Sequence, residues 1–175
     1  FKGRTVEVSA KGADRVEFQV APNPGEGLKP MARIASGGEL SRIMLALKSI
    51  LAELDQIPTM VFDEIDVGIG GRTAQAVAEK LLLIGQSRQV VCVTHLPQIS
   101  SLAKRHFFIE KKVAGNRTQV TVRVLSMNER VEELSRMLGG AQVTDTTRQH
   151  AREMLMLAER LRLKKVGQIH QEKLT

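Results

Sequence analysis

The sequence contains no tryptophan or tyrosine and a single cysteine, Cys92. One cysteine excludes an internal disulfide and a zinc site of clustered cysteines. Because Cys92 lies in the apolar run QVVCVT, we expect a buried, unreactive thiol. Without tryptophan or tyrosine, stacking of single-stranded nucleic acid would depend on the five phenylalanines, which mostly lie in apolar runs.

Long hydrophobic runs are absent as well. No apolar stretch approaches the roughly 20 residues that span a bilayer, and the N-terminal FKGRTVEVSA lacks the apolar core of a signal peptide. We therefore expect a cytoplasmic protein without a membrane partner. Because residue 1 is phenylalanine rather than methionine, we also expect the chain to be a fragment of a longer protein.

The residues that are present favour a folded domain with a basic surface. Hydrophobic residues make up 42% of the 175 positions and charged residues 26%, which is enough apolar material for one core. The net charge is +7, and between Arg148 and Lys165 there are six basic and two acidic residues. This stretch is consistent either with a polyanionic partner such as DNA or with a solvated helix face.

Periodicity in the first third of the chain predicts a hairpin and a long helix. Alternation over residues 4–9 and 15–21 indicates two strands, and the proline- and glycine-rich residues 22–30 indicate a loop. A helix follows, because apolar residues recur every three or four positions and form one stripe: Leu40, Ile43, Met44, Leu47, Ile50, Leu51 and Leu54.

The middle of the chain reads as strand, helix, strand. TMVFDE at 59–64 and QVVCVTH at 89–95 are apolar runs typical of strands buried on both faces, and a helical pattern from Ala74 to Ile84 ends at Gly85. Within about 35 residues this is the size of a βαβ unit. The two strands should therefore be parallel and joined by a right-handed crossover.

The last third is predicted to hold a short helix, a hairpin and two more helices. The helix starts at Pro97, the hairpin joins HFFIEKKV to TQVTVRVL, and the final helices cover about 128–138 and 145–164. We predict an α/β fold with one domain over residues 1–165 and a flexible tail over 166–175.

Polar residues gather at the ends of both apolar strands. Asp63 and Glu64 end the first, and Thr94 and His95 end the second, so a parallel pairing brings them to one edge. One carboxylate can hold a hard cation such as Mg²⁺ while the other orients a water molecule. The alternative is that these residues only mark where the strands enter solvent.

Two adjacent glycines stand at the predicted start of the long helix. Gly37 and Gly38 follow Ser36, and a helix N-terminus has unpaired amides that bind anions. Glycines there would let a bulky phosphate approach the backbone. If Ser36 is simply an N-cap, the serine is explained and the two glycines are not.

Three motifs follow one another along the chain: SGGEL, an apolar strand followed by DE, and an apolar strand followed by TH. Together they resemble the C-terminal half of an ABC-type ATPase head. Residues 36–39 match the signature motif, 59–64 the Walker B strand, 67–70 the D-loop, and His95 the switch histidine. IASGGELSR and VTHLPQI are similar to the RecN family of bacterial DNA repair proteins, relatives of the SMC chromosome proteins. The resemblance covers roughly residues 14–140.

The resemblance implies a P-loop NTPase-like ABC/SMC head that binds ATP and Mg²⁺. Asp63 would bind Mg²⁺ through water, Glu64 would polarise the attacking water, and His95 would contact that water or the γ-phosphate. The residues implied in binding nucleotide are Ser36, Gly37, Gly38 and Glu39, which face the ATP of the opposing head, with Gly68 and Gly70 in the D-loop. Many family members have aspartate where this chain has Gly70.

The resemblance also implies partners. The phosphate loop G-x-x-x-x-G-K-[ST] is absent from the sequence; in the family it lies in an N-terminal segment beyond a long coiled coil. The implied assembly is a homodimer with ATP between its heads, working on DNA in the nucleoid during double-strand break repair, recombination and the SOS response. This fragment alone would then be inactive.

Two other functions stay open. One is a non-enzymatic DNA-binding module that uses the basic C-terminal helix. The other is the ATPase subunit of a membrane transporter, which Glu39 and the sequence DEIDVG disfavour, because transport ATPases usually have glutamine and DEPTSALD there.

Overall fold

The computed structural model describes most of the chain after the N-terminal segment. The described residues are 10, 12, 14, 16–21, 25, 27–33, 36–51, 57–114, 117–140 and 142–172. β1 (Gln19–Val20) pairs antiparallel with β2 (Lys29–Pro30), and the 3-10 helix η1 (Met31–Arg33) follows. The predicted loop over residues 22–30 is therefore wrong at its C-terminal end, where Lys29 and Pro30 form a strand. The predicted strand at 4–9 lies outside the described residues.

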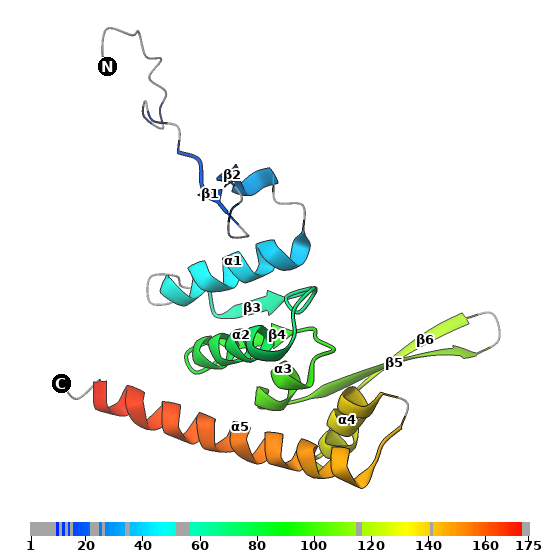
Figure 1. Ribbon diagram of the computed structural model, residues 1–175. Coiled ribbons are helices and arrows are strands. Elements are labelled where there is room, and N and C mark those ends of the chain that lie inside the picture. The colour runs from blue at the N-terminus through cyan, green and yellow to red at the C-terminus, as the bar shows by residue number, and fades with distance from the viewer. Residues whose placement is uncertain are drawn as a thin grey trace, which may run out of the picture.

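The central strand, helix, strand prediction is confirmed. β3 (Thr59–Phe62) pairs in parallel with β4 (Gln89–Cys92), with Phe62 opposite Cys92, and α2 (Gly71–Ile84) connects them and ends at Gly85. The α/β fold class is confirmed by this unit together with the flanking helices and hairpins (Figure 1).

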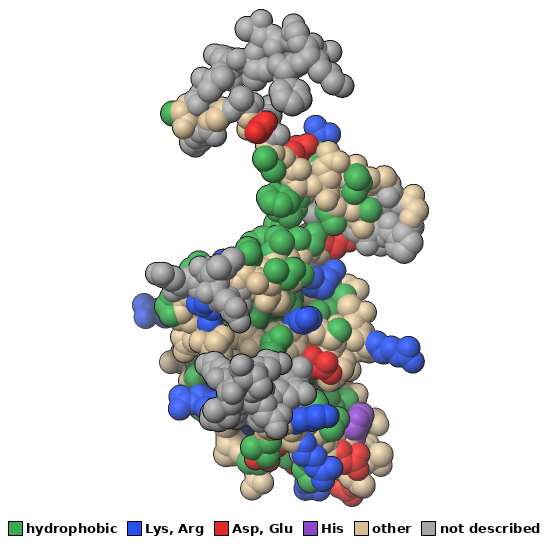
Figure 2. Space-filling view, turned by 90° about the vertical axis from the view of Figure 1, so that its left-hand side faces the viewer, with side chains coloured by type: hydrophobic (Ala, Val, Ile, Leu, Met, Phe, Trp, Pro, Cys, Tyr) green, Lys and Arg blue, Asp and Glu red, His purple; other side chains and the backbone are tan. Residues whose placement is uncertain are grey.

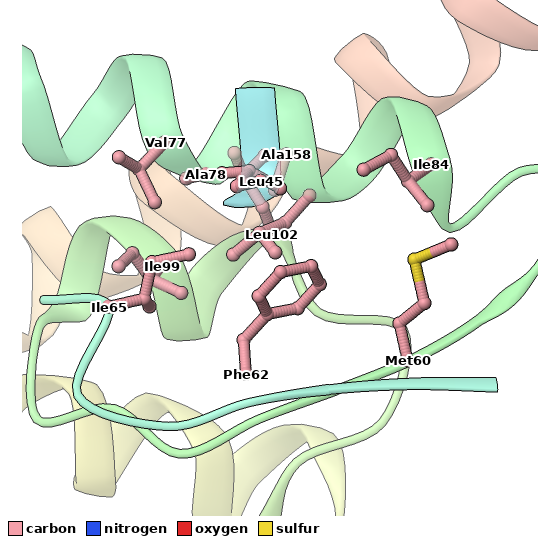
Figure 3. Close-up of a cluster of buried hydrophobic side chains, with 11 residues drawn as sticks. Leu45, Met60, Phe62, Ile65, Val77, Ala78, Ile84, Ile99, Leu102 and Ala158 are labelled. Carbon is pink, nitrogen blue, oxygen red and sulfur yellow. The ribbon is translucent and has the colours of Figure 1, made fainter. Parts of the chain in front are cut away.

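One hydrophobic core joins this unit to the helices around it. Met60 and Phe62 point from β3 toward α2, where Ile84 lies near Met60 (Figure 3), and Val77 of α2 belongs to the same cluster. α1 (Gly37–Ile50), α3 (Pro97–Leu102) and α5 (Asp145–Glu172) also reach this core. The buried members are Leu45, Met60, Phe62, Ile65, Val77, Ala78, Leu81, Ile84, Ile99, Leu102 and Ala158.

The opposite face of β3 and β4 is open. Val61 is 69% exposed, and Val91 and Val93 are exposed beside it, so the prediction of strands buried on both faces is wrong for the described residues. The predicted apolar stripe of α1 is also partly exposed, since Leu40 and Met44 are exposed while Leu45 enters the core. No element among the described residues covers these side chains.

The C-terminal third matches its prediction closely. β5 (Phe107–Ala114) and β6 (Arg117–Val124) form a hairpin that projects away from the core, and α4 (Met127–Gly139) packs against α5 (Figure 1). α5 continues to Glu172, beyond the predicted end near 164. Whether the tail is flexible stays a prediction. No helix among the described residues is long and apolar enough to cross a membrane.

Candidate functional site

The two predicted acids lie in a tight turn directly after β3, which we call the acid turn (residues 63–67). The turn is closed by the Val67 amide, which donates to the Glu64 carbonyl at 3.1 Å. Glu64 has φ = 57°, a left-handed conformation that costs energy in any residue other than glycine and that often marks functional positions. Asp63 and Glu64 are exposed, whereas Ile65 and Asp66 are buried.

The first turns of α1 are bonded to the acid turn. The Ser41 hydroxyl donates to the Asp63 carbonyl at 3.0 Å. Arg42 Nη1 donates to the carbonyls of Ile65 at 3.3 Å and Val67 at 2.9 Å. These three bonds hold the start of α1 beside the acids, and sequence reasoning assigned no such role to Arg42.

This contact supplies a reason for the paired glycines. A Cβ on Gly37 would collide with the Glu64 carboxylate, and one on Gly38 would lie 2.9 Å from the Glu64 carbonyl oxygen and 3.1 Å from that of Val67. Gly38 faces backbone that cannot easily move, so it is the stricter requirement. Ser36 is the N-cap of α1, one of the two roles considered for it from the sequence, and accepts from the Glu39 amide at 3.5 Å.

β4 brings His95 to the same edge. The Val93 amide donates to the Phe62 carbonyl at 3.0 Å, so the residues after β4 run beside the acid turn. There Asp66 Oδ2 accepts from Thr94 Oγ1 at 2.7 Å and from the His95 amide at 2.8 Å, and His95 Nδ1 lies 2.9 Å from the same oxygen. Asp66 thus joins the acid turn to His95, a contact that sequence reasoning missed.

The electrostatics of Asp66 fit an ionised carboxylate. Burial alone would raise its pKa, but hydrogen bonds from Thr94 and the His95 amide, with the positive charge that His95 can carry, hold the pKa below its usual value. Burial, followed by the charges of Asp66 and Asp63, raises the pKa of Cys92 to about 12. The half-buried Cys92 thiol therefore stays protonated, in line with the expected unreactive cysteine.

The remaining predicted positions lie around the acid turn. Gly68 (φ = 72°) and Gly70 occupy the exposed loop that leads into α2, and a Cβ on either would meet no atom within 4 Å. Gly70 is the N-cap of α2 in an extended conformation. The structure therefore leaves room for a side chain at Gly70.

Asp63 is the one predicted metal ligand. Its Oδ1 accepts from the Glu64 amide at 2.9 Å, and the side chain is exposed at the strand end. Among the described residues no group of three or more histidine, cysteine or acidic side chains could hold a metal ion. An exposed carboxylate fits Mg²⁺, which keeps several waters and takes few protein ligands.

Sequence comparison identifies the relatives of this chain. No family model matches it. The DNA repair protein RecN of Halalkalibacterium halodurans is 49% identical over 147 residues, which cover 84% of this chain. RecN of Bacillus subtilis is 44% identical over 91% of the chain, and RecN of Streptomyces coelicolor is 48% identical over 89%. The chain belongs to the RecN family. Its predicted resemblance to that family is confirmed.

The chain spans about a quarter of the length of these RecN proteins, 26%, 28% and 27% respectively. A solved structure from a study of ATP-driven dimerization and DNA-stimulated activation of SMC ATPases aligns with 78% of this chain and 81% of its own. That alignment has 18% identity and a TM-score of 0.48.

Proposed function

We propose that this segment supplies one half of an ATP-hydrolysing site in an SMC-like protein that repairs DNA double-strand breaks. The observation that carries the proposal is the meeting of three features at one edge of β3 and β4. These are the exposed acids Asp63 and Glu64, the N-terminus of α1, and the loop that carries His95. The role of the relatives as DNA repair proteins supports the cellular part of the proposal.

The acid turn and His95 would share the chemistry. Asp63 is the residue that would hold Mg²⁺, which would supply positive charge to offset the charge of the phosphates. Glu64 accepts a hydrogen bond from the attacking water and aligns it with the γ-phosphate. His95 contacts that water or a γ-phosphate oxygen, and its exposed side chain supports this role.

The N-terminus of α1 would complete the site of a second protomer. Ser36, Gly37, Gly38 and Glu39 face the phosphates of the ATP held by the opposing head, where unpaired helix amides favour anions. Gly68 and Gly70 form the D-loop between the two sites. A two-fold homodimer repeats the arrangement and makes hydrolysis depend on head engagement.

The Walker A half of the same protein is the proposed neighbour of the open surfaces. A groove of about 400 Å³ between α1 and β3 is lined by Leu40, Met44, Ile57 and Val61 among others. Exposed apolar surface of this kind favours burial against another part of the protein. The relatives are long enough to provide that part.

A DNA-binding module based on the basic helix has less support. Within α5, Arg148 bonds to Glu132 and Asp145, and Arg162 donates to backbone carbonyls at the end of α3. Lysine and arginine side chains are spread over the face in Figure 2 rather than gathered in one patch. DNA binding is therefore proposed for the whole protein and not assigned to α5.

The test is Glu64→Gln in the full-length protein. We expect ATP binding to persist, the ATP-bound dimer to accumulate, and turnover to fall about a hundredfold or more, because general base catalysis is lost. Glu79→Gln, the same change on the exposed face of α2, is the matched control and should turn over normally. Normal turnover of Glu64→Gln would remove Glu64 from the mechanism.

A second measurement tests the division of the site. The 175-residue chain alone should hydrolyse ATP negligibly, and adding the remainder of the protein should restore turnover. Robust hydrolysis by the chain alone would contradict the composite site.

A further inference from the structure

Asp66 is a buried carboxylate outside the set of residues assigned above. Its side chain is 4% exposed, and three polar groups lie within 2.9 Å of one oxygen, Oδ2. Two of them, Thr94 Oγ1 and the His95 amide, fix the backbone of the loop after β4. The third, His95 Nδ1, belongs to an imidazole that is itself 73% exposed. One residue therefore anchors both the loop and the ring at its tip.

The protonation of the ring follows from this geometry. An ionised carboxylate has lone pairs and no proton to donate, so the 2.9 Å approach of His95 Nδ1 to Asp66 Oδ2 is favourable when that nitrogen carries a proton. The lowered pKa of Asp66 keeps the carboxylate ionised at neutral pH. In the neutral imidazole the other nitrogen, Nε2, then carries the lone pair.

We infer that Asp66 is a positioning residue that holds His95 in the Nδ1-protonated tautomer and leaves Nε2 free for the nucleotide or its attacking water. The catalytic part of this inference rests on the proposed function, whereas the tautomer of His95 does not depend on that function. Because Asp66 belongs to the acid turn, the imidazole is tied to the same turn as Asp63 and Glu64. A shift of that turn would move both partners of the attacking water together.

The tautomer can be measured without catalysis. Magic-angle-spinning NMR of the full-length protein labelled with ¹⁵N-histidine reports which imidazole nitrogen is protonated, and the His95 signals are those lost in His95→Gln. At a pH where the ring is neutral, we expect Nδ1 to be protonated in the wild type. A bare Nδ1 in the wild type would overturn the inference even if no Asp66 variant folds.

Substitution then tests the cause. In Asp66→Ala we expect the Nδ1-protonated form to lose its dominance, while Asp66→Asn, which keeps an acceptor oxygen, should retain it. Thr94→Val removes a different bond to the same Oδ2 and should also keep the wild-type tautomer. An unchanged tautomer in Asp66→Ala would show that Asp66 does not control the ring.

Kinetics of the full-length protein separate positioning from loop folding. We expect Asp66→Ala to lower kcat for ATP about tenfold or more, as for other residues that orient a histidine, with the Kd for ATP changed less than about threefold. In a His95→Ala background the same substitution should change kcat less than about twofold. An equal loss in both backgrounds would overturn the inference. If His95→Ala itself keeps normal kcat, the proposed function fails while the tautomer result still stands.

Discussion

The two ends of α3 differ in the charge that holds them. On the N-terminal side the Asp66 carboxylate accepts from residues of the loop that enters the helix. On the C-terminal side Arg130, 6% exposed, donates through Nη2 to the carbonyls of Ser100, Ser101 and Ala103 at 3.5, 3.3 and 2.8 Å. Each charge matches the helix end it faces, because free amides lie at the start of a helix and free carbonyls at its end.

The difference lies in what each end is connected to. At the Asp66 end the imidazole of His95 is exposed, so the bonds there hold a side chain that a ligand can reach. The Arg130 end is internal and ties α3 to α4, while Arg162 adds a bond from α5 to the Ala103 carbonyl at 3.0 Å. One short helix is therefore bonded to its neighbours at its C-terminal end and adjoins an exposed imidazole at its N-terminal end.

The largest effect at the two ends of α3 is expected from Arg130→Met. It leaves buried carbonyls without their donor, so we expect the free energy of local opening of α3 to fall by about 2 kcal/mol. The measurement is hydrogen exchange of peptides covering residues 97–106 in the full-length protein. Arg136→Met on the same helix, where the arginine is exposed and bonded to Glu133, is the matched control and should change exchange little. Equal exchange in both variants would mean that the buried charge does not hold α3.

A smaller effect is expected from Arg162→Ala, about 1 kcal/mol in the same exchange measurement. Arg130 and Arg162 both donate to the Ala103 carbonyl. In the double variant that carbonyl loses both donors, so the combined loss should exceed the sum of the single losses by about 0.5 kcal/mol or more. Simple additivity would show that the two arginines act independently at the end of α3.

Local patterns in the sequence were sufficient for the elements from α1 onward and for the edge at which Asp63 and His95 meet. The apolar runs before Asp63 and His95 and the helical period between them predicted the parallel pairing of β3 and β4. Ser36 and Gly85 marked helix ends through capping chemistry that involves near neighbours. The exposure of Asp63 and Glu64 could also be predicted, because β3 ends where the apolar run ends.

The buried polar contacts could not be predicted in the same way. Asp66 meets Thr94 across 28 positions of sequence and Arg130 meets Ser100 across 30, and no periodic pattern encodes such partners. A third acid so soon after Asp63 was the one available signal for Asp66. The exposed face of β3 was missed for another reason: an apolar run predicts burial but not which part of a protein provides the cover.

The smallest and most specific effect should come from pH, which separates the two ends of α3. His106 lies near the Arg130 end, with Nδ1 3.2 Å from Ser100 Oγ. Burial, then the charge of Arg130, lowers the pKa of His106 below 6.5, against a weaker opposing effect of Glu133. Below pH 6.5 the unfolded chain therefore binds the proton more readily, and stability at this end is lost as pH falls through the folded value.

The Asp66 end should respond in a different window. Its folded pKa lies below 3.8, so its contribution is complete above pH 3.8 and is lost only as pH falls through the folded value. When the pH is lowered from 7 to 5, amide hydrogen exchange, corrected for the intrinsic rate, should accelerate more at residues 103–106 than at residues 94–97. His106→Asn should abolish that difference, and Arg130→Met should reduce it by raising the pKa of His106. Parallel changes at both ends in the wild type would contradict the assignment of separate titrating groups to the two ends of α3.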